Sequence, residues 1–332
     1  MKNITVCPSL LTQGFHDYSP KAIKTLFSGN KTSCMLEFRL DDKEIRDSKS
    51  VINLSISGAQ EKYPALLDGG KIRLARPEER STFILKPAPI DRIYLRKAIP
   101  ANEHLTMQIA SQVYGIETAL NGLCFDSSGQ TIYITKRFDI EPDGKKIDME
   151  DFASLVGKST NNGGPEYKYN ASYEEIALAI RKNIPAKAVI LEKFLRLVVF
   201  NYLIGNGDAH LKNFSIIRRN GDVTLAPAYD LINTALHIKG DDFALKDGLS
   251  PNIEPSDQYV ATGHPCKLDF ERFGQLIGIS EKRIAHILNP FMNFPTKVDE
   301  LIAHSFLPDE KTKRTYRAII EERRKRFIRK SL

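Results

Sequence analysis

Residues 205–216 read GNGDAHLKNFSI and place Asp208 five residues before Asn213. An apolar run, Phe194 to Ile204, leads in and predicts a buried helix, and a strand-like run, Phe214 to Ile217, leads out. A carboxylate and an amide on such a short loop are typical of phosphoryl-transfer sites. There an Asp takes the proton of an attacking hydroxyl and an Asn holds a metal ion on the phosphates. The alternative is a polar turn whose Asp and Asn satisfy local backbone groups.

A second carboxylate follows the loop after a predicted hairpin, whose turn is Asn220 and Gly221. Residues 226–233 read APAYDLIN and contain this carboxylate, Asp230. Two carboxylates and an amide on either side of a hairpin are the components of a protein-kinase-like catalytic centre. Asp230 therefore favours the catalytic interpretation of the loop over the polar turn.

The region before the loop contains a candidate phosphate-binding turn and a candidate lysine. Residues 51–67, VINLSISGAQEKYPALL, are predicted to turn near Gly58. Lys71–Ala75 and Thr82–Leu85 predict two further strands, the second ending at Lys86. A small-residue turn gives backbone N–H groups room to approach phosphate oxygens, and a lysine adds positive charge. One glycine is also typical of an ordinary hairpin.

A predicted amphipathic helix, Ala101 to Tyr114, carries Glu103 in its first turn. Glu103 either stabilises the helix N-terminus through the helix dipole or forms an ion pair that orients Lys86. Leu123–Phe125 and Thr131–Thr135 then predict a hairpin around SSGQ (127–130), which ends in KRFD, Lys136 to Asp139. That position suits a hinge between two lobes, where backbone groups meet an adenine ring.

Helical periodicity dominates after Asp139. Helices are predicted to begin near residue 151 and over 172–182, 187–204, 268–277 and 281–292, and the Gly- and Asn-rich residues 158–170 predict a loop. Earlier, Pro20–Phe27 predicts a helix capped by Ser19, and Met35–Leu40 alternates as a strand would. Strands first and helices second predict an α+β fold, with a β-rich lobe at 1–139 and a helical lobe at 140–332.

Composition excludes several classes of protein. The 332 residues are 42% hydrophobic and 27% charged with a net charge of +7, as in ordinary globular proteins. No apolar run is long enough for a membrane span or a signal peptide, so we expect a cytoplasmic protein without membrane contact. Four scattered cysteines argue against a zinc site or a disulfide framework. The basic tail, 311–330, predicts a helix packed by one face or a surface that attracts an acidic partner.

With these residues noted, the sequence resembles the HipA family of bacterial serine/threonine kinases, the toxins of toxin–antitoxin modules. The resemblance runs over most of the chain from about residue 50. Seven motifs carry it in family order: SISGAQEKY (55–63), FILKP (83–87), NEH (102–104), KRFD (136–139), EDFASLVG (150–157), GNGDAHLKNFSI (205–216) and LAPAYD (225–230). The resemblance implies a bilobal, HipA-like protein-kinase fold that uses ATP and Mg²⁺.

The resemblance also implies a role for each matched position. Asp208 looks like the catalytic base, Asn213 and Asp230 look like the Mg²⁺ ligands, and Lys86 would pair with the α- and β-phosphates. The other implied ATP-binding residues are Ser57, Gly58, Ala59, Gln60, Glu61 and Lys62 over the nucleotide, Lys136, Arg137, Phe138 and Asp139 in the hinge, and His210, Lys212 and Tyr229 near the phosphates and metal.

Regulation and partners also follow from the resemblance. The family autophosphorylates a serine three residues before its glycine, which is Ser55 here, and Ser57 is a second candidate. A phosphate there would repel nucleotide or eject the loop, so modification is expected to inactivate. Full-length members carry an extra N-terminal subdomain that this chain lacks room for, so the chain resembles the short HipT branch. The expected partners are a HipS-like small protein and a HipB-like DNA-binding antitoxin, with DNA contacted only through the antitoxin.

Three functions remain open at this point. The first is a protein Ser/Thr kinase toxin whose substrate, by resemblance, is an aminoacyl-tRNA synthetase, phosphorylated so that translation stops. The second is a small-molecule kinase of the same architecture, but such kinases lack the GAQEKY loop. The third, motivated by the basic tail, is a catalytically silent regulator that binds an antitoxin and DNA. The joint presence of Lys86, Asp208, Asn213 and Asp230 argues against this third possibility.

Overall fold

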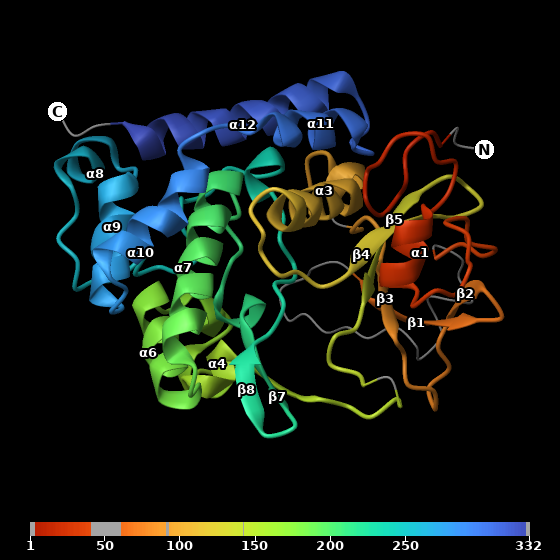
Figure 1. Ribbon diagram of the computed structural model, residues 1–332, viewed down its shortest axis with the longest axis horizontal. Coiled ribbons are helices and arrows are strands. Elements are labelled where there is room, and N and C mark those ends of the chain that lie inside the picture. Colours follow the sequence, from red (N-terminus) through yellow and green to blue (C-terminus); the bar gives the residue numbers. More distant parts are fainter. Residues whose placement is uncertain (1–3, 41–60, 91–92, 142, 330–332) are drawn as a thin grey trace. The chain divides into compact units, whose positions relative to one another are not determined.

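Two structural units, each built from separated stretches of sequence, divide the chain (Figure 1). The computed structural model describes residues 4–40, 61–90, 93–141 and 143–329. Unit 1 comprises Met1–Ile109, Thr118–Lys146 and Lys297–Lys313, and unit 2 comprises Ala110–Glu117, Ile147–Thr296 and Arg314–Leu332. The predicted lobe boundary between residues 139 and 140 stays a prediction.

Unit 1 is organised around a five-stranded antiparallel sheet of order β2-β1-β3-β5-β4. Its strands are β1 (Tyr63–Asp68), β2 (Lys71–Leu74), β3 (Phe83–Lys86), β4 (Asn121–Phe125) and β5 (Thr131–Lys136). The strands predicted after residue 70 and the predicted hairpin are thereby confirmed. Strand β3 buries Phe83 and Leu85, and Lys86 ends it opposite Tyr133 of β5.

The first helix of unit 1 begins where its capping residue predicts. Helix α1 (Pro20–Leu26) starts after Ser19, whose side chain accepts a hydrogen bond from the Ala22 N–H, as predicted. The strand predicted for Met35–Leu40 is wrong, because that segment makes only an isolated bridge to Phe125 at the end of β4. Helix α3 (Ile99–Gln112) follows a short 3₁₀ turn, η1 (Arg96–Ala98).

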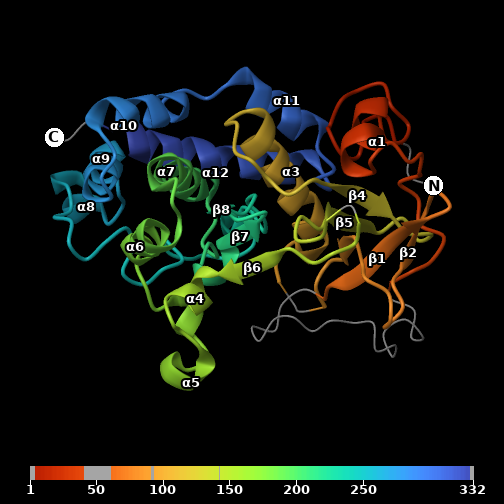
Figure 2. The ribbon, with the colours of Figure 1, turned by 60° about the horizontal axis from the view of Figure 1, so that its bottom comes forward.

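Unit 2 contains most of the helices, which Figures 1 and 2 show around α7. The helical segments of unit 2 after β5 are α4 (Phe152–Leu155), α5 (Thr160–Gly163), η2 (Tyr167–Tyr169), α6 (Tyr173–Asn183), α7 (Lys187–Ile204), η3 (Leu211–Asn213), η4 (Thr234–Leu236), α8 (Asp257–Thr262), α9 (Lys267–Leu276), α10 (Glu281–Leu288), η5 (Asn289–Phe291) and most of α12 (Glu310–Ile328). Helix α11 (Thr296–His304) belongs to unit 1 from Lys297 on. Helix α7 has the predicted bounds, and its residues from Leu197 to Ile204 are all buried. Helices α6 and α10 both pack against it.

A three-stranded sheet leads directly out of the predicted catalytic loop. It consists of β6 (Asp148–Asp151), β7 (Ser215–Arg219) and β8 (Asp222–Leu225) in the order β6-β7-β8. The predicted β7–β8 hairpin is confirmed, with positive φ at both turn residues, Asn220 and Gly221. Strand β6 was not predicted, because its sequence, DMED, lacks the alternation of a half-buried strand.

Aromatic side chains pack against the elements on both sides of the Asp208 loop. Phe214, immediately after Asn213, meets Phe194 of α7 at a ring-centroid distance of 5.6 Å and Tyr173 of α6 at 6.2 Å. Tyr202 near the end of α7 lies 5.1 Å from Phe270 of α9. Both ends of the loop are therefore fixed to buried rings. Among the described residues, no helix is long and apolar enough to cross a bilayer.

Candidate active site

Unit 1 contributes one buried ion pair. The Lys86 Nζ donates to Glu103 Oε1 at 2.7 Å, and the two side chains are only 5% and 4% exposed. The ammonium also lies 5.2 Å from the centroid of the Tyr133 ring. Helix α3 begins at Ile99, so Glu103 occupies its second turn and not its first. The helix-dipole role is therefore wrong for Glu103, and the alternative ion pair with Lys86 is observed.

The predicted hinge, Lys136 to Asp139, begins at the last residue of β5 in unit 1. The Arg137 guanidinium donates twice to the Asp139 carboxylate, at 2.9 and 2.6 Å, and once to the Ser81 hydroxyl. Lys136 Nζ donates to Ser28 Oγ at 2.6 Å, and partial burial lowers the pKa of Lys136. Asp139 thus already has a cationic partner. The roles of Lys136 to Asp139, Phe138 included, in binding adenine and ribose stay predictions.

Only the end of the predicted nucleotide-covering loop falls within the described residues. Glu61 accepts a hydrogen bond from the Tyr63 hydroxyl at 2.6 Å, and Lys62 directly precedes β1. The other predicted members lie outside the described residues; they are Ser55, Ser57, Gly58, Ala59 and Gln60.

The Asp208 loop in unit 2 starts with a helix end that requires glycine. Gly205 terminates α7 with φ +76°, and a Cβ at this position would lie 3.1 Å from the Ala235 Cβ. The Thr234 hydroxyl donates to the Gly205 carbonyl at 3.0 Å and accepts from the Gly207 N–H at 2.7 Å. Thr234, the first residue of η4, therefore holds the turn before Asp208 at two points.

The backbone of Asp208 is fixed by its own loop. Its N–H donates to Asn206 Oδ1 at 3.1 Å, and its carbonyl accepts from the His210 N–H and from Asn213 Nδ2, each at 2.8 Å. The last bond orients the Asn213 amide so that its oxygen faces away from that carbonyl. The Asp208 carboxylate is 48% exposed. A held backbone with an accessible carboxylate suits a group that receives protons from an incoming molecule.

His210 stands beside the carboxylate as a neutral ring. Its side chain is 7% exposed, and its Nε2 lies 3.9 Å from Asp208 Oδ1. Burial lowers the pKa of His210 to about 4, against the smaller opposing effect of Asp208, so the imidazole is uncharged at neutral pH. Its buried Nδ1 has no hydrogen-bond partner among the described residues.

Tyr229 ties the segment after β8 to the loop. Its hydroxyl donates to the Lys212 carbonyl at 2.8 Å and lies 2.6 Å from Ser215 Oγ. Burial raises the pKa of Tyr229, which keeps the phenol protonated. The next residue, Asp230, has φ +54°, a conformation that non-glycine residues seldom adopt and that costs of order 1–3 kcal/mol. Asp230 thus has an unfavourable backbone conformation and directly follows the residue whose hydroxyl contacts η3.

Sequence reasoning missed Tyr169, whose hydroxyl donates to Asp208 Oδ1 at 2.7 Å. The residue lies in the segment that was predicted only as a polar loop, 39 positions before Asp208. It also missed Asn206, Ser215 and Thr234 as supports of the loop, since each acts through a hydrogen bond that spacing alone does not predict.

The basic tail contributes to this region through its packed face. The Arg323 guanidinium of α12 donates to the Tyr202 carbonyl at 3.0 Å and lies 3.1 Å from Asp242, with both side chains buried. Tyr316, Ile320 and Phe327 of the same helix are also buried. The prediction of a terminal helix packed by one face is therefore confirmed.

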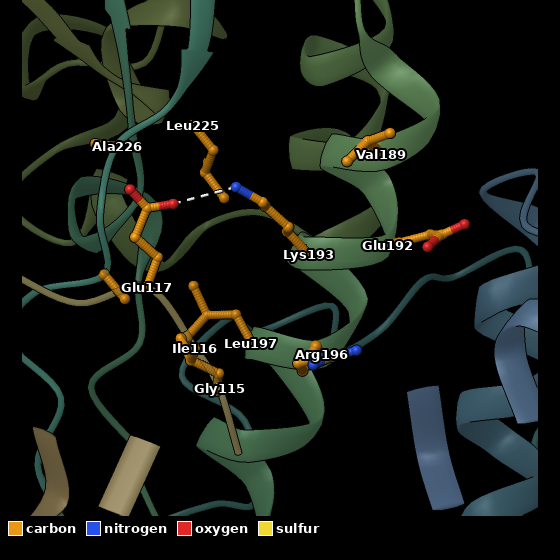
Figure 3. A pocket seen from close by; sticks show the side chains of 11 residues that line it. Gly115, Ile116, Glu117, Val189, Glu192, Lys193, Arg196, Leu197, Leu225 and Ala226 are labelled. Atoms are coloured by element: carbon orange, nitrogen blue, oxygen red, sulfur yellow. Dashed lines mark hydrogen bonds and ion pairs between the residues drawn. The ribbon is translucent and has the colours of Figure 1, made fainter. Parts of the chain in front are cut away.

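The pocket in Figure 3 lies in unit 2. It has a volume of about 310 Å³ and lies between residues 115–117, one face of α7, and residues 225–228. Glu117 and Lys193 form an ion pair of 3.1 Å across it, as the figure shows. None of the predicted site residues lines it.

Sequence comparison relates the chain to a known family. A model of the family described as "HipA-like C-terminal domain" matches residues 54–297. A Haemophilus influenzae protein named "Putative kinase" is 27% identical over 269 residues, which cover 77% of this chain and 76% of that protein. Two Sinorhizobium fredii proteins, "Putative kinase Y4mE" and "Putative kinase Y4dM", are 31% and 29% identical. Their matches cover 56% and 74% of this chain but only 44% and 56% of their own lengths, so the chain spans about half of them.

Solved structures show the same fold. One is the Shewanella oneidensis MR-1 toxin–antitoxin protein HipA, determined in a complex with HipB and operator DNA. It superposes with a TM-score of 0.64 at 20% identity, over 86% of this chain and 67% of HipA. The Helicobacter pylori proinflammatory kinase CtkA superposes with a TM-score of 0.52 at 15% identity, over 81% of this chain and 91% of CtkA. The predicted α+β, kinase-like fold is confirmed, and the chain belongs to the HipA-like C-terminal domain family of kinase-like proteins.

Proposed function

We propose that this protein is an ATP-dependent protein serine/threonine kinase in which Asp208 is the base that accepts the proton of the acceptor hydroxyl. One observation carries the proposal. Asp208 presents a half-exposed carboxylate from a loop whose backbone is held by Asn206, His210 and Asn213. In phosphoryl transfer, where most of the catalysis is positioning, a base of this kind is what the acceptor requires.

The residues present fit a magnesium-bound nucleotide. Mg²⁺ in kinases is held by one or two side chains together with substrate phosphates and water, so a dedicated protein cage is not required. The described residues contain no group of three or more His, Cys, Asp or Glu that could hold a metal ion on its own. Asp230 and the oriented amide of Asn213 would hold the ion, which would neutralise charge on the phosphates. Lys86, held by Glu103, would pair with the α- and β-phosphates.

His210 and Lys212 would flank the phosphates in different charge states. His210 is neutral and buried, so it offers shape and a hydrogen bond without charge. Lys212 lies in η3 between His210 and Asn213, and its carbonyl is held by Tyr229. The loop can thus place one cation beside the phosphates without adding a second that would attract the Asp208 carboxylate.

We extend the proposal to a toxin of a toxin–antitoxin module. Its support is the sequence resemblance together with the fold shared with HipA, whose structure contains HipB and operator DNA. On this proposal, a HipB-like antitoxin and a HipS-like protein bind the chain, and the acceptor is a protein, by resemblance an aminoacyl-tRNA synthetase. Autophosphorylation of Ser55 or Ser57 would inactivate the kinase by placing negative charge where ATP phosphates bind.

The proposal is tested by incubating the protein with γ-labelled ATP, Mg²⁺ and a bacterial lysate. We expect at least one labelled lysate protein, and about 10²–10⁴-fold slower labelling with Asp208→Asn, because general-base catalysis contributes about that much. Asp222→Asn is the matched control, since Asp222 is an exposed carboxylate in β8 of the adjoining hairpin. A labelled metabolite without a labelled protein would identify a small-molecule kinase instead. No transfer, with no Mg·ATP-dependent thermal shift, would identify a silent regulator.

Mass spectrometry of the peptide that contains Ser55 and Ser57 tests the switch separately. We expect phosphate on one or both serines in wild-type protein treated with Mg·ATP, and none in Asp208→Asn. Protein that has become phosphorylated should lose transfer to lysate proteins in proportion. Full transfer activity in fully phosphorylated protein would contradict the inactivating role while leaving the kinase assignment intact.

A further inference from the structure

Tyr169 is held at its position by backbone hydrogen bonds within unit 2. It ends η2, in the connection between α5 and α6. Its carbonyl accepts from the N–H groups of Ala171 at 3.0 Å and of Lys246 at 2.9 Å, and its own N–H donates to Glu166 at 2.9 Å. The side chain therefore leaves the backbone from a fixed point, although the connection has little regular structure.

The Tyr169 side chain contacts the loop in two ways. Its hydroxyl donates to Asp208 Oδ1 at 2.7 Å, and its ring meets the His210 ring edge to face, with centroids 5.0 Å apart. Burial and then the charge of Asp208 raise the pKa of Tyr169, so the phenol stays protonated at neutral pH. A protonated phenol can only donate to a carboxylate, which gives the contact a fixed direction.

The Asp208 carboxylate has little else to orient it. The other bonds of this residue hold its backbone N–H and carbonyl. His210 Nε2, at 3.9 Å, is beyond hydrogen-bond distance. Over the described ranges, Tyr169 is thus the one side chain that donates a hydrogen bond to this carboxylate. A half-exposed Asp without such a donor would sample several rotamers.

We propose that Tyr169 is a positioning residue that holds Oδ1 of Asp208 so that Oδ2 faces the acceptor hydroxyl. The inference rests on the proposed role of Asp208 as the base. A general base is effective only when it lies within hydrogen-bond reach of the proton it removes, and a misplacement of about 1 Å costs about 10²-fold in rate. A base oriented by a third group is also the arrangement that recurs in nucleophile–base pairs.

The test is Tyr169→Phe, which removes the hydroxyl and keeps the ring against His210. Initial rates of labelling of the lysate protein are measured against ATP concentration for the wild-type and variant full chains. We expect the maximal rate to fall about 10–100-fold and the KM for ATP to change by less than about twofold, because the lost bond acts on the base and not on the nucleotide. The melting temperature should fall by no more than that of the control described next.

Tyr167→Phe is the matched control, because it removes a phenol hydroxyl two residues away, in the same η2, that does not bond Asp208. Its maximal rate should equal that of wild type. Tyr169→Leu, which also removes the ring, should be no faster than Tyr169→Phe. Together the three variants separate loss of the donor from loss of packing.

The possible outcomes divide cleanly. A Tyr169→Phe rate equal to wild type would overturn the inference. A faster rate would also overturn it and would show that the hydroxyl occupies the place of the acceptor. A rate loss matched by a large fall in melting temperature would assign Tyr169 a structural role only. If the wild type labels nothing, the proposed function fails first; if it labels and Asp208→Asn does not, the function stands and Tyr169→Phe decides the inference alone.

Discussion

The Lys86 group of unit 1 (Lys86 and Glu103) and the Asp208 group of unit 2 (Asp208, Tyr169 and His210) both contain charged side chains, yet they are built differently. In unit 1, Lys86 and Glu103 neutralise each other out of contact with water, and His104 lies next along α3. In unit 2, Asp208 keeps half its surface exposed and is held by a neutral phenol, with His210 beside it. The two charges of the Lys86 group neutralise each other, whereas the Asp208 group leaves a negative charge available to an incoming molecule.

This difference predicts which group contributes more to the stability of the fold. A buried pair is costly to break, because removal of one partner leaves the other charge without compensation in a medium of low polarity. An exposed carboxylate has water as a replacement partner, so its loss costs little stability. We therefore expect the loss of one charged partner to cost much more stability in unit 1 than in unit 2.

The largest expected effect on stability is that of Glu103→Ala. It leaves the Lys86 ammonium buried without its carboxylate, which should lower the free energy of unfolding by about 3–5 kcal/mol. Urea denaturation of the full chain measures this. The double variant Lys86→Met/Glu103→Leu is the control, and we expect it to lie within about 1 kcal/mol of wild type, since apolar replacement of a buried pair is often neutral.

The same double variant sharpens the comparison with the Asp208 group. It should fold as well as wild type but transfer no phosphate, because it lacks the proposed phosphate-binding lysine. A cost below about 1 kcal/mol for Glu103→Ala would contradict the idea that Lys86 is held as a buried cation.

The second effect is that the two buried histidines, His104 and His210, make the fold less stable in mild acid. Burial lowers the pKa of His104 and of His210 to about 4, from 6.5 in the unfolded chain. Between these values the unfolded state binds more protons than the folded state, so stability falls as the pH falls from about 6.5 to 4. Each histidine should contribute about 3 kcal/mol over that window, at about 1.4 kcal/mol per pH unit.

The variants His104→Gln and His210→Gln separate the two contributions when unfolding free energies are measured at intervals from pH 7 to pH 4.5. In each variant the free energy of unfolding should fall less steeply with falling pH than in wild type, and in the double variant it should fall least steeply. His104 Nε2 lies 2.8 Å from the Ser9 carbonyl oxygen, whereas His210 adjoins Asp208, so unequal slopes would rank the two environments. A His210→Gln decline identical to wild type would mean that the folded protein protonates His210 freely.

Local sequence patterns predicted much of the Asp208 group and less of its surroundings. Helix α7 was predicted with its observed bounds, because a continuous apolar run meets a glycine at its end. Tyr169 could not be predicted, since its hydrogen bond joins residues 39 positions apart through a segment without periodicity. The strand expected at Met35–Leu40 shows the reverse error: alternation was present, but only one bridge formed to the end of β4. Patterns report which face is buried, whereas contacts between loops depend on the assembled fold.

The smallest expected effect of the three is that of Gly205→Ala, at about 2 kcal/mol. An alanine there must adopt the left-handed conformation at φ +76°, which costs about 1–2 kcal/mol, and its Cβ would crowd Ala235 and the Asn233 side chain at 3.1 and 3.2 Å. Gly221→Ala is the matched control, because Gly221 also has positive φ but a Cβ added there would meet no atom within 4 Å. The difference between the two variants isolates the crowding at the base of the Asp208 loop.

The rate of phosphoryl transfer should also distinguish Gly205→Ala from Gly221→Ala. Because Gly205 precedes Asp208 by only three residues and shares Thr234 with Gly207, the displaced turn should slow transfer about tenfold or more, although the stability cost is modest. Gly221→Ala should lose a comparable amount of folding stability through its positive φ and should transfer phosphate at the wild-type rate. Equal rates in the two variants would show that the loop absorbs the shift before it reaches Asp208, and that the carboxylate is positioned by Tyr169 more than by its own backbone.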